Sequence, residues 1–311
     1  MAKPVVVFGS FVVDLMARAD HLPVPGETVK SDLFKMGPGG KGFNQAVAAK
    51  RAGAGVEMVT KLGEDSFANV CLEMMEGEGM DRSHVFVTDK ASTGAALIMV
   101  DEHTSQNQIL VTLGACSTFD DADIAQVTPL IEGAGILLTQ LETNVDAVEK
   151  VIDIAHRSGT TVVLNTAPVQ PITDEMLRQV DVITPNEVEA SILTGVEIRT
   201  PDDALKAAQV FLDKGVGQVV ITLGKQGVLA VTPQRHQLFG NYDVPVLDTT
   251  GAGDAFNGGF VAALAEGKDL FEACAFGNAV SNLAVTKMGT SVAMPHRAEV
   301  DAFIAENGLI K

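Results

Sequence analysis

Short apolar runs alternate along most of the chain with segments in which apolar residues recur at helical spacing. The runs are rich in Val, Ile and Leu and end at Gly, Asn or Pro, as buried parallel strands do. Predicted strands cover residues 5–8, 56–60, 136–139, 162–164, 182–184 and 219–222. Predicted helices cover residues 44–51, 144–157 and 202–214, each closed by a glycine. The alternation indicates an α/β fold: a doubly wound, mostly parallel sheet flanked by helices.

Two regions break this alternation. Residues 17–36 and 93–113 have strand-like patterns without helices between them, and 95–100 with 109–113 predict a hairpin. We expect these regions to form a small separate β layer. Near the end of the chain, residues 250–264, 271–286 and 297–306 predict three successive helices. Neither an internal repeat nor a Ser- or Pro-rich linker interrupts the sequence, so residues 1–311 are expected to form one domain that includes this β layer.

Composition and charge narrow the choice of partners. The 311 residues include 40 acidic and 22 basic ones, which gives a formal net charge of -18. Such a surface repels nucleic acid and anionic membranes, so neither is expected as a partner. An anionic small substrate stays open, because local N–H groups, a lysine or a metal can override the overall field. Three scattered cysteines, no signal-peptide pattern and no run of ~18 apolar residues predict a protein of the cytoplasm.

The strongest chemical signal is Asp248-Thr249-Thr250-Gly251-Ala252-Gly253-Asp254, which lies between a strand-like stretch, 242–247, and a helix of small residues. A glycine-rich turn from strand to helix aims several backbone N–H groups at one point, where they can bind an anion. Asp254 in the first helical turn can accept a proton from a substrate hydroxyl, as phosphoryl transfer requires. The alternative is an N-cap and turn chosen only for conformation. Two glycines and two acids in one short turn favour the functional interpretation.

A second signal is the glycine-rich segment from Gly37 to Asn44, immediately before a predicted helix. It satisfies GxGxxG, but the residues before it are too polar for the buried strand of a dinucleotide-binding unit. A phosphate P-loop is excluded as well, because Lys41 is followed by Gly42 where a Ser or Thr would bind magnesium. What remains is a loop whose backbone can approach a ligand while Lys41 and Asn44 supply polar groups, or else an ordinary glycine-rich connector.

Together these motifs resemble the ribokinase family of PfkB-type carbohydrate kinases, and the resemblance covers nearly the whole chain. The matching segments, in order, are Gly9-Ser10 with Asp14, Pro25-Gly26-Glu27-Thr28, Gly39-Gly40-Lys41-Gly42-Phe43-Asn44-Gln45-Ala46, Gln140-Leu141-Glu142, Thr184-Pro185-Asn186-Glu187 with Glu189, Ile221-Thr222-Leu223-Gly224, and Asp248 to Asp254. So many ordered motifs are far more specific than any single one.

The resemblance implies an ATP-dependent sugar kinase that phosphorylates a primary hydroxyl of a small monosaccharide, a pentose such as ribose or 2-deoxyribose. In this family Asp254 would be the catalytic base, and Gly251, Ala252 and Gly253 would form the anion hole. The sugar would contact Asp14, Val12, Gly40, Lys41, Gly42, Asn44 and Glu142. The adenine nucleotide would contact Asn186, Thr222, Gly224, Gly227 and Asn278.

The resemblance also implies ions and an assembly. Glu189, in the family's NxxE motif, would help to place Mg²⁺. A potassium ion is common in the family beside the anion hole, and the matching positions are Asp248, Thr250, Ala284, Lys287, Gly289 and Ala293. Ribokinases usually have a serine where this chain has Ala293, which puts potassium dependence in question. The β layer would be a lid over the sugar, and paired lids would make a homodimer.

One departure bears on the substrate. Ribokinases have an asparagine two residues before the sugar-binding aspartate, whereas this chain has Val12 before Asp14. A sugar hydroxyl left unpaired against an isopropyl group costs about 1 to 3 kcal/mol. Deoxyribokinases are similar to this chain in having an apolar residue there, so 2-deoxyribose is a candidate beside ribose. The alternative is that Val12 only packs at the end of a strand.

Other functions fit the sequence less well. A hexose or nucleoside could be the substrate on the same fold, although one Tyr and no Trp disfavour a base-stacking pocket. A sugar-binding regulator without catalysis is a second alternative, against which the intact Asp254 and its flanking glycines argue. An NAD-linked dehydrogenase, suggested only by the GxGxxG match, is the third.

Overall fold

The computed structural model describes residues 3–104 and 106–310 and is built on one large sheet. Its nine strands have the order β13-β12-β11-β10-β9-β8-β1-β4-β5, and only β12 and β13 run antiparallel to their neighbours. The six strands predicted from apolar runs are all present, so the predicted fold class is confirmed. The bounds are β1 Val5–Phe8, β4 Val56–Gly63, β5 Val85–Thr88, β8 Ile136–Gln140, β9 Thr161–Asn165, β10 Val182–Ile183, β11 Gln218–Thr222, β12 Val228–Val231 and β13 His236–Phe239.

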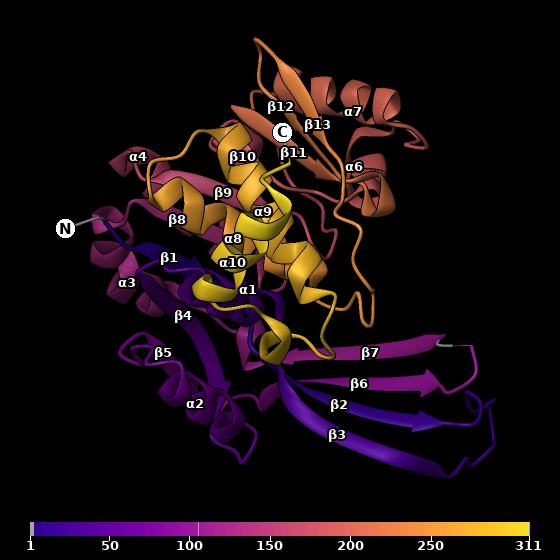
Figure 1. The fold of residues 1–311 in the computed structure, drawn as a ribbon. Coiled ribbons are helices and arrows are strands. Elements are labelled where there is room, and N and C mark those ends of the chain that lie inside the picture. The colour runs from indigo at the N-terminus through magenta and orange to yellow at the C-terminus, as the bar shows by residue number, and fades with distance from the viewer. Residues whose placement is uncertain (1–2, 105, 311) are drawn as a thin grey trace.

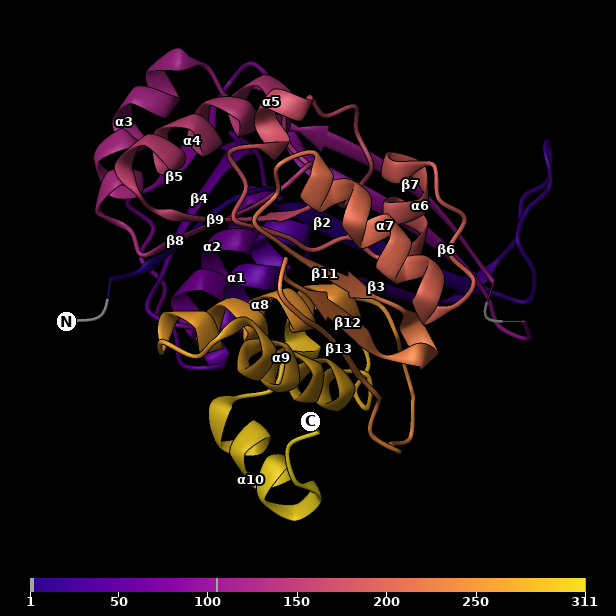
Figure 2. The same ribbon diagram turned by 90° about the horizontal axis from the view of Figure 1, so that it is seen from above.

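Helices cover both faces of this sheet, as the two views in Figures 1 and 2 show. One core packs α1 (Lys41–Arg51), α2 (Ala68–Gly77), α8 (Ala252–Ala265), α9 (Leu270–Ala284) and α10 (Arg297–Asn307) against one face. The other core contains α3 (Asp121–Gly133), α4 (Val145–Ser158), α5 (Asp174–Leu177), α6 (Glu187–Thr194) and α7 (Pro201–Asp213). Alternate residues of each strand enter opposite cores, which explains why the buried strands read as continuous apolar runs.

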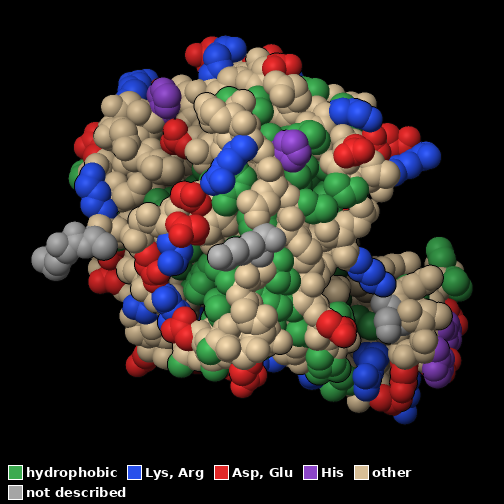
Figure 3. All heavy atoms as spheres, turned by 45° about the horizontal axis from the view of Figure 1, so that its top comes forward, with side chains coloured by type: hydrophobic (Ala, Val, Ile, Leu, Met, Phe, Trp, Pro, Cys, Tyr) green, Lys and Arg blue, Asp and Glu red, His purple; other side chains and the backbone are tan. Residues whose placement is uncertain are grey.

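A smaller sheet projects from the body as an arm (Figure 1). Its order is β3-β2-β6-β7, with β2 Val12–Ala19, β3 Ser31–Gly39, β6 Thr93–Asp101 and β7 Asn107–Gly114. The separate β layer is therefore present, but its first strand begins at Val12 and not near residue 17, because Val12 to Ala19 pair with both β3 and β6. Figure 3 shows an open notch between this arm and the body.

Two local predictions need correction. Residues 242–247, predicted as a strand before α8, form an extended loop: Val246 and Leu247 are exposed, and Pro245 lacks the N–H that a strand pairing would use. The helix predicted from residue 44 begins at Lys41, because Gly40, with a φ of 89°, ends the preceding strand and lets the chain turn sharply into α1.

The described residues contain no helix that is both long and apolar enough to cross a bilayer. Cys71, Cys116 and Cys274 are buried and form no disulfide. Short 3₁₀ turns at Ala115–Ser117 (η1), Gly224–Gln226 (η2) and Ser291–Ala293 (η3) complete the fold, and the second and third of these lie beside the candidate site described next.

Candidate active site

The turn that enters α8 presents free backbone N–H groups. Gly251 is the N-cap of α8 in a left-handed conformation with a φ of 76°, which favours glycine. Among the described residues, the N–H groups of Gly253 and Asp254 have no hydrogen-bond acceptor, whereas that of Ala252 is bonded to the carbonyl of Thr249. Free N–H groups at a helix N-terminus can bind an anion. The geometry of an anion-binding turn is thus present where the sequence predicts it.

Asp254 is buried in the first turn of α8 and is held by two amides of α1. Asn44 Nδ2 donates to Asp254 Oδ2 at 2.9 Å, and Gln45 Nε2 donates to Asp254 Oδ1 at 2.9 Å. The two helices come this close because Gly258 of α8 faces α1: a Cβ there would lie 2.3 Å from the Cβ of Ala48. The glycine therefore lets the two helix backbones approach, which brings Asp254 within reach of the first turn of α1.

The electrostatic surroundings prepare Asp254 as a proton acceptor. Burial raises the pKa of Asp254, while Lys41 and the amides of Gln45 and Asn44 oppose this rise. Burial alone would lower the pKa of Lys41, but nearby carboxylates, Asp254 first among them, outweigh it and raise the pKa. Lys41 therefore stays a cation beside Asp254. A carboxyl with a raised pKa is the stronger base for a substrate hydroxyl.

The predicted sugar residues converge around this carboxylate. Glu142, after β8, accepts hydrogen bonds on Oε2 from Ser10 Oγ at 2.6 Å and from the Lys41 N–H at 2.8 Å. The pKa of Asp14 is raised to about 6: burial is the main cause, the charges of Glu142 and Asp254 add to the rise, and Thr290 and Lys41 oppose it. Three carboxylates and one ammonium group thus lie close enough to interact. The carboxylates can accept hydrogen bonds from vicinal hydroxyls, and the ammonium group can donate to a hydroxyl oxygen.

Glycines explain how the backbone fits at this point. The backbone of Gly42 passes so close to that of Gly9 that a Cβ on Gly42 would lie 2.6 Å from the Cα of Gly9. A Cβ on Gly40 would lie 2.8 Å from the N of Val12. Gly40 and Gly42 therefore contribute close approach and leave hydrogen bonding to their neighbours.

Val12 is buried at the start of β2. It shares one face of that strand with Asp14, because alternate residues point the same way. Its Cγ1 packs against Gly94 of β6, and a Cβ on that glycine would lie 2.8 Å from it. Val12 thus both packs at the strand end and lies on the face that carries a predicted sugar ligand.

The predicted nucleotide residues gather after the ends of β10 and β11 and beside the middle of α9. Asn186 is the N-cap of α6 and forms a β-bridge with Thr222. Gly224 and Gly227 lie in and after the η2 turn, and both have positive φ angles. Asn278 of α9 donates to the carbonyl of Gly240 at 2.7 Å. Asn241, which follows Gly240 in the chain, donates to the carbonyl of Gly224 at 2.8 Å. Two connected loops therefore link all five predicted residues.

The acidic residues fit a sparsely ligated Mg²⁺. Glu189 accepts hydrogen bonds from the Asn186 N–H at 3.1 Å, from Asn186 Nδ2 at 2.8 Å and from Thr166 Oγ at 3.0 Å. In the described part of the chain, no three His, Cys, Asp or Glu side chains form a metal-binding cluster. Mg²⁺ in kinases usually keeps several waters and takes one or two carboxylates with the phosphates. The carboxylates present fit that pattern, in which water and phosphates supply most of the ligands, and they do not fit a site made of protein ligands alone.

The positions predicted for a monovalent cation are only partly brought together. The carboxylate of Asp248 accepts hydrogen bonds from the N–H groups of Thr250 at 2.9 Å and Gly289 at 3.0 Å. The carbonyl of Ala284 accepts from the Lys287 N–H at 3.0 Å, and a carbonyl can accept a second partner. Ala293 is buried in η3 and offers no hydroxyl. Backbone carbonyls near these positions fit a cation, but with one oxygen ligand fewer than a serine would give.

Several residues that contact the site were missed by sequence reasoning. Gln45 is fully buried; its Nε2 also donates to Asn165 Oδ1 at 3.1 Å, and its Oε1 accepts from Gln140 Nε2 at 2.7 Å. Thr290 and Ser291 bond to Asp14 and Asn44 respectively. The position of Gln45, next to Asn44 in the first helical turn, was the one available signal. The resemblance places Gly289 and Ala293 beside the anion hole, but no sequence pattern points to a direct contact between residues near 290 and Asn44.

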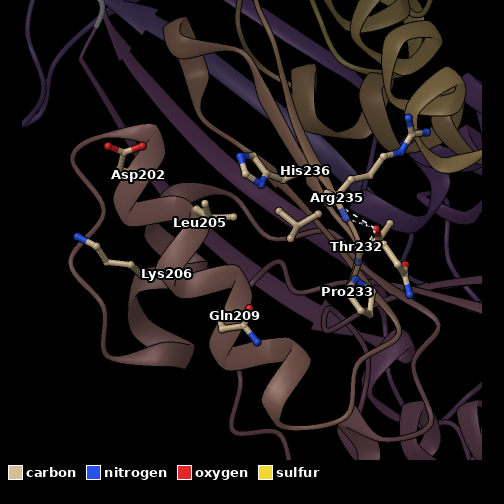
Figure 4. Close-up of a pocket in the computed structure, with 10 residues that line it drawn as sticks. Asp202, Leu205, Lys206, Gln209, Thr232, Pro233, Arg235 and His236 are labelled. Atoms are coloured by element: carbon tan, nitrogen blue, oxygen red, sulfur yellow. Dashed lines mark hydrogen bonds between the residues drawn. The ribbon is translucent and has the colours of Figure 1, made fainter.

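A pocket of about 580 Å³ lies elsewhere, between α7 and the turn that joins β12 to β13 (Figure 4). Asp202, Lys206 and Gln209 line it from the helix, and Arg235 and His236 from the hairpin. None of the predicted site residues lines this pocket. Its two basic groups are engaged, since Lys206 pairs with Asp203 and Arg235 with Asp269. The chemistry of the site is therefore separate from this cavity.

Comparisons with known proteins identify the family. The pfkB family carbohydrate kinase pattern matches residues 2–297. The chain is 41% identical over 304 residues to a ribokinase of Haemophilus influenzae, with 98% of this chain and 99% of that protein covered. It is 32% identical over 304 residues to a deoxyribokinase of Salmonella typhimurium, with 97% and 99% covered. The structure of Arabidopsis thaliana ribokinase complexed with ribose and ATP aligns with a TM-score of 0.90 at 31% identity, covering 98% of this chain and 99% of that one.

The chain belongs to the pfkB family of carbohydrate kinases. It is a phosphotransferase whose acceptor is an alcohol group, and within the family it is similar to the ribokinases over its whole length. The predictions of family, fold class and enzyme class are confirmed, and the dehydrogenase alternative is wrong.

Proposed function

We propose that this protein transfers the γ-phosphoryl group of ATP to the primary hydroxyl of a pentose, ribose or 2-deoxyribose. One observation carries the proposal: the buried Asp254 lies in the same helical turn as free N–H groups and within interaction range of Asp14, Lys41 and Glu142. A base, an anion-binding turn and hydroxyl ligands are what phosphoryl transfer to a sugar needs. The ribokinase and deoxyribokinase relatives support a pentose as the acceptor.

In the proposed reaction, Asp254 accepts the proton of the sugar hydroxyl while the oxygen of that hydroxyl forms a bond to the γ-phosphorus. The bond from that phosphorus to the β,γ-bridging oxygen breaks, and ADP leaves with the electron pair. Gly251, Ala252 and Gly253 line the turn whose N–H groups stabilise the charge on the transferred group. Asp14, Gly40, Lys41, Gly42, Asn44 and Glu142 surround the sugar.

The nucleotide and ions are part of the same proposal. Asn186, Thr222, Gly224, Gly227 and Asn278 contact ATP, which is supported by their common location at two linked loops. Mg²⁺, when bound, neutralises phosphate charge, and Glu189 helps to position it through the groups that its carboxylate holds. Potassium, with Asp248, Thr250, Ala284, Lys287, Gly289 and Ala293 beside it, is proposed to activate weakly, because Ala293 supplies no hydroxyl.

The small sheet is proposed to be a lid that pairs with the lid of a second copy. Asp14 lies on one face of this sheet, and the pairing register puts Phe34, Met36, Leu97 and Leu110 on the other. These four side chains are 65%, 54%, 49% and 66% exposed. An apolar face of this kind favours association. Sedimentation should give a dimer, and Leu110→Glu should shift it toward the monomer.

The cytoplasm is the proposed location, which the three unpaired cysteines support.

The substrate preference is proposed to depend on Val12. Its isopropyl group, on the same strand face as Asp14, cannot bond a sugar hydroxyl, so a sugar without that hydroxyl loses nothing there. Val12→Asn should shift the ratio of kcat/KM values toward ribose over 2-deoxyribose. An unchanged ratio would mean that Val12 serves only the packing against Gly94.

The test of the proposal is ADP release with magnesium ATP and a panel of pentoses, 2-deoxyribose, hexoses and nucleosides, with and without potassium. We expect turnover with a pentose, and its loss in Asp254→Asn, which keeps the size of the side chain but removes the base. Turnover with no sugar, in a protein that still binds one, would overturn the proposal in favour of a sugar-binding regulator.

A further inference from the structure

The loop formed by residues 289–294 joins several groups of the candidate site. The hydroxyl of Thr290 lies 3.0 Å from the carbonyl of Pro38 and 3.4 Å from Asp14 Oδ2, and these two acceptors share its single proton. Ser291 Oγ donates to Asn44 Oδ1 at 2.5 Å, and Asn44 in turn donates to Asp254. The loop therefore contacts two predicted sugar ligands directly and the predicted base through one of them.

One buried arginine binds the backbone of this loop. Arg51, the last residue of α1, donates from Nη1 to the carbonyls of Ser291 at 3.2 Å, Val292 at 3.3 Å and Met294 at 2.6 Å. Its Nε and Nη2 bind the carboxylate of Glu78, at the end of α2, at 3.1 Å and 2.6 Å. The side chains of Arg51 and Glu78 are only 11% and 12% exposed. A planar guanidinium has the fixed donors for both partners, which an ammonium group lacks.

Besides Arg51, the loop is held at its two ends. The N–H of Gly289 donates to Asp248 at 3.0 Å, and Met294 is buried in the core, whereas Val292 between them is 58% exposed. Gly289 at its start has a φ of 105°. Three carbonyls bound to one guanidinium outnumber the backbone bonds within η3, where the N–H of Ala293 bonds to Thr290 and that of Met294 to Ser291. Arg51, at the C-terminal end of α1, therefore supplies most of the hydrogen bonds to the loop backbone between these two ends.

We propose that Arg51, paired with Glu78, is a positioning residue for the sugar: it fixes the 289–294 loop, and the loop orients Asn44 and Asp14. The inference rests on the proposed sugar site and names residues that touch neither sugar nor ATP. A merely structural ion pair would stabilise the fold without favouring one substrate. A positioning residue changes the KM for the sugar and leaves the KM for ATP unchanged.

The main test compares Arg51→Lys with a matched control, Arg297→Lys. Arg297 also donates to a backbone carbonyl near the end of α1, that of Ala52 at 3.2 Å, and pairs with Glu266 and Asp301; no hydrogen bond joins it to the loop among the described residues. We expect Arg51→Lys to raise the KM for the pentose about tenfold, the effect of losing one charged hydrogen bond, with the KM for ATP within about twofold of wild type. Arg297→Lys should change neither. Equal sugar KM values in the two variants would overturn the proposal.

A second set of variants begins with Ser291→Ala, which leaves the buried ion pair intact. Ser291→Ala should raise the sugar KM by itself, and adding Arg51→Lys to it should raise KM by less than the product of the single effects, because both changes break one path. A wild-type sugar KM for Ser291→Ala, or multiplicative effects in the double variant, would overturn the proposal, even if Arg51→Lys failed to fold. Unchanged sugar binding in Asp14→Ala and Asn44→Ala, measured by calorimetry, would instead refute the sugar site itself.

Discussion

Replacing Gly42 by Ala is expected to damage the active site through a contact of backbone with backbone. A Cβ at this position would lie 2.6 Å from the Cα of Gly9 and 2.7 Å from the N of Ser10. Ordinary contact begins near 3.4 Å, so the start of α1 must retreat by about 0.8 Å. Lys41, Asn44 and the rest of that turn would move with it. A displacement of about 1 Å at a catalytic group can reduce the rate about 100-fold.

The assay is ADP release under kcat/KM conditions, and the expectation runs against helix propensity. Gly→Ala inside a helix normally stabilises by about 0.5 to 1 kcal/mol. Gly77→Ala, in the last turn of α2 with nothing within 4 Å of the new Cβ, is the matched control and should behave in that way with full activity. If Gly42→Ala kept wild-type kcat/KM, the close approach of α1 to β1 would not control the site.

Three further changes test the surroundings of the site. Gln45→Met removes a hydrogen bond to ionised Asp254 and so raises the pKa of Asp254. We expect kcat to fall about tenfold and the acidic limb of the pH profile of kcat to move to higher pH. An unmoved limb would contradict the reasoning. The pKa of Asp14 is raised to about 6, chiefly by burial, so the contribution of Asp14 to stability is present below about pH 4 and is lost as the pH rises through 6. In urea unfolding, Asp14→Asn should be more stable than wild type by about 1 to 3 kcal/mol at pH 7.5, with no gain at pH 4. Lys61→Met leaves the carboxylate of Asp123 buried without its cation, 2.5 Å away in the intact pair, and should cost about 3 to 5 kcal/mol; a loss under about 1 kcal/mol would show that water reaches the site.

Features that depend on residues adjacent in the sequence were predictable. Apolar runs of three to five residues identified every parallel strand of the sheet except the edge strand β5, Val85–Thr88, because strands buried on both faces need no polar positions. The Gly251 turn and Asp254 were predictable for a similar reason, since a strained turn and the first residues of a helix follow one another in the chain.

Features that depend on distant partners were not predictable from the residues alone. Residues 242–247 have a strand-like composition, but no neighbouring strand accepts them, and pairing is a property of the whole sheet. The bond between Ser291 and Asn44 joins positions 247 apart in sequence. The role of Gly258 was equally hidden, because a glycine in a small-residue helix has meaning only when the facing helix is known.

The proposed site is divided between early and late parts of the chain, and this division matters while the chain is being synthesised. Every proposed sugar ligand lies at or before Glu142, whereas Asp254 and its N–H groups belong to α8, which packs along α1. Domains begin to form while the rest of the chain is still being synthesised. A nascent chain that has assembled its sugar-holding half therefore has neither the base nor the turn for phosphate. An unfinished chain on the ribosome therefore cannot transfer phosphate, and its Asp14 and Asn44 still lack the 289–294 loop that bonds to them. Sugar binding and catalysis are completed together, when the last helices pack against the first.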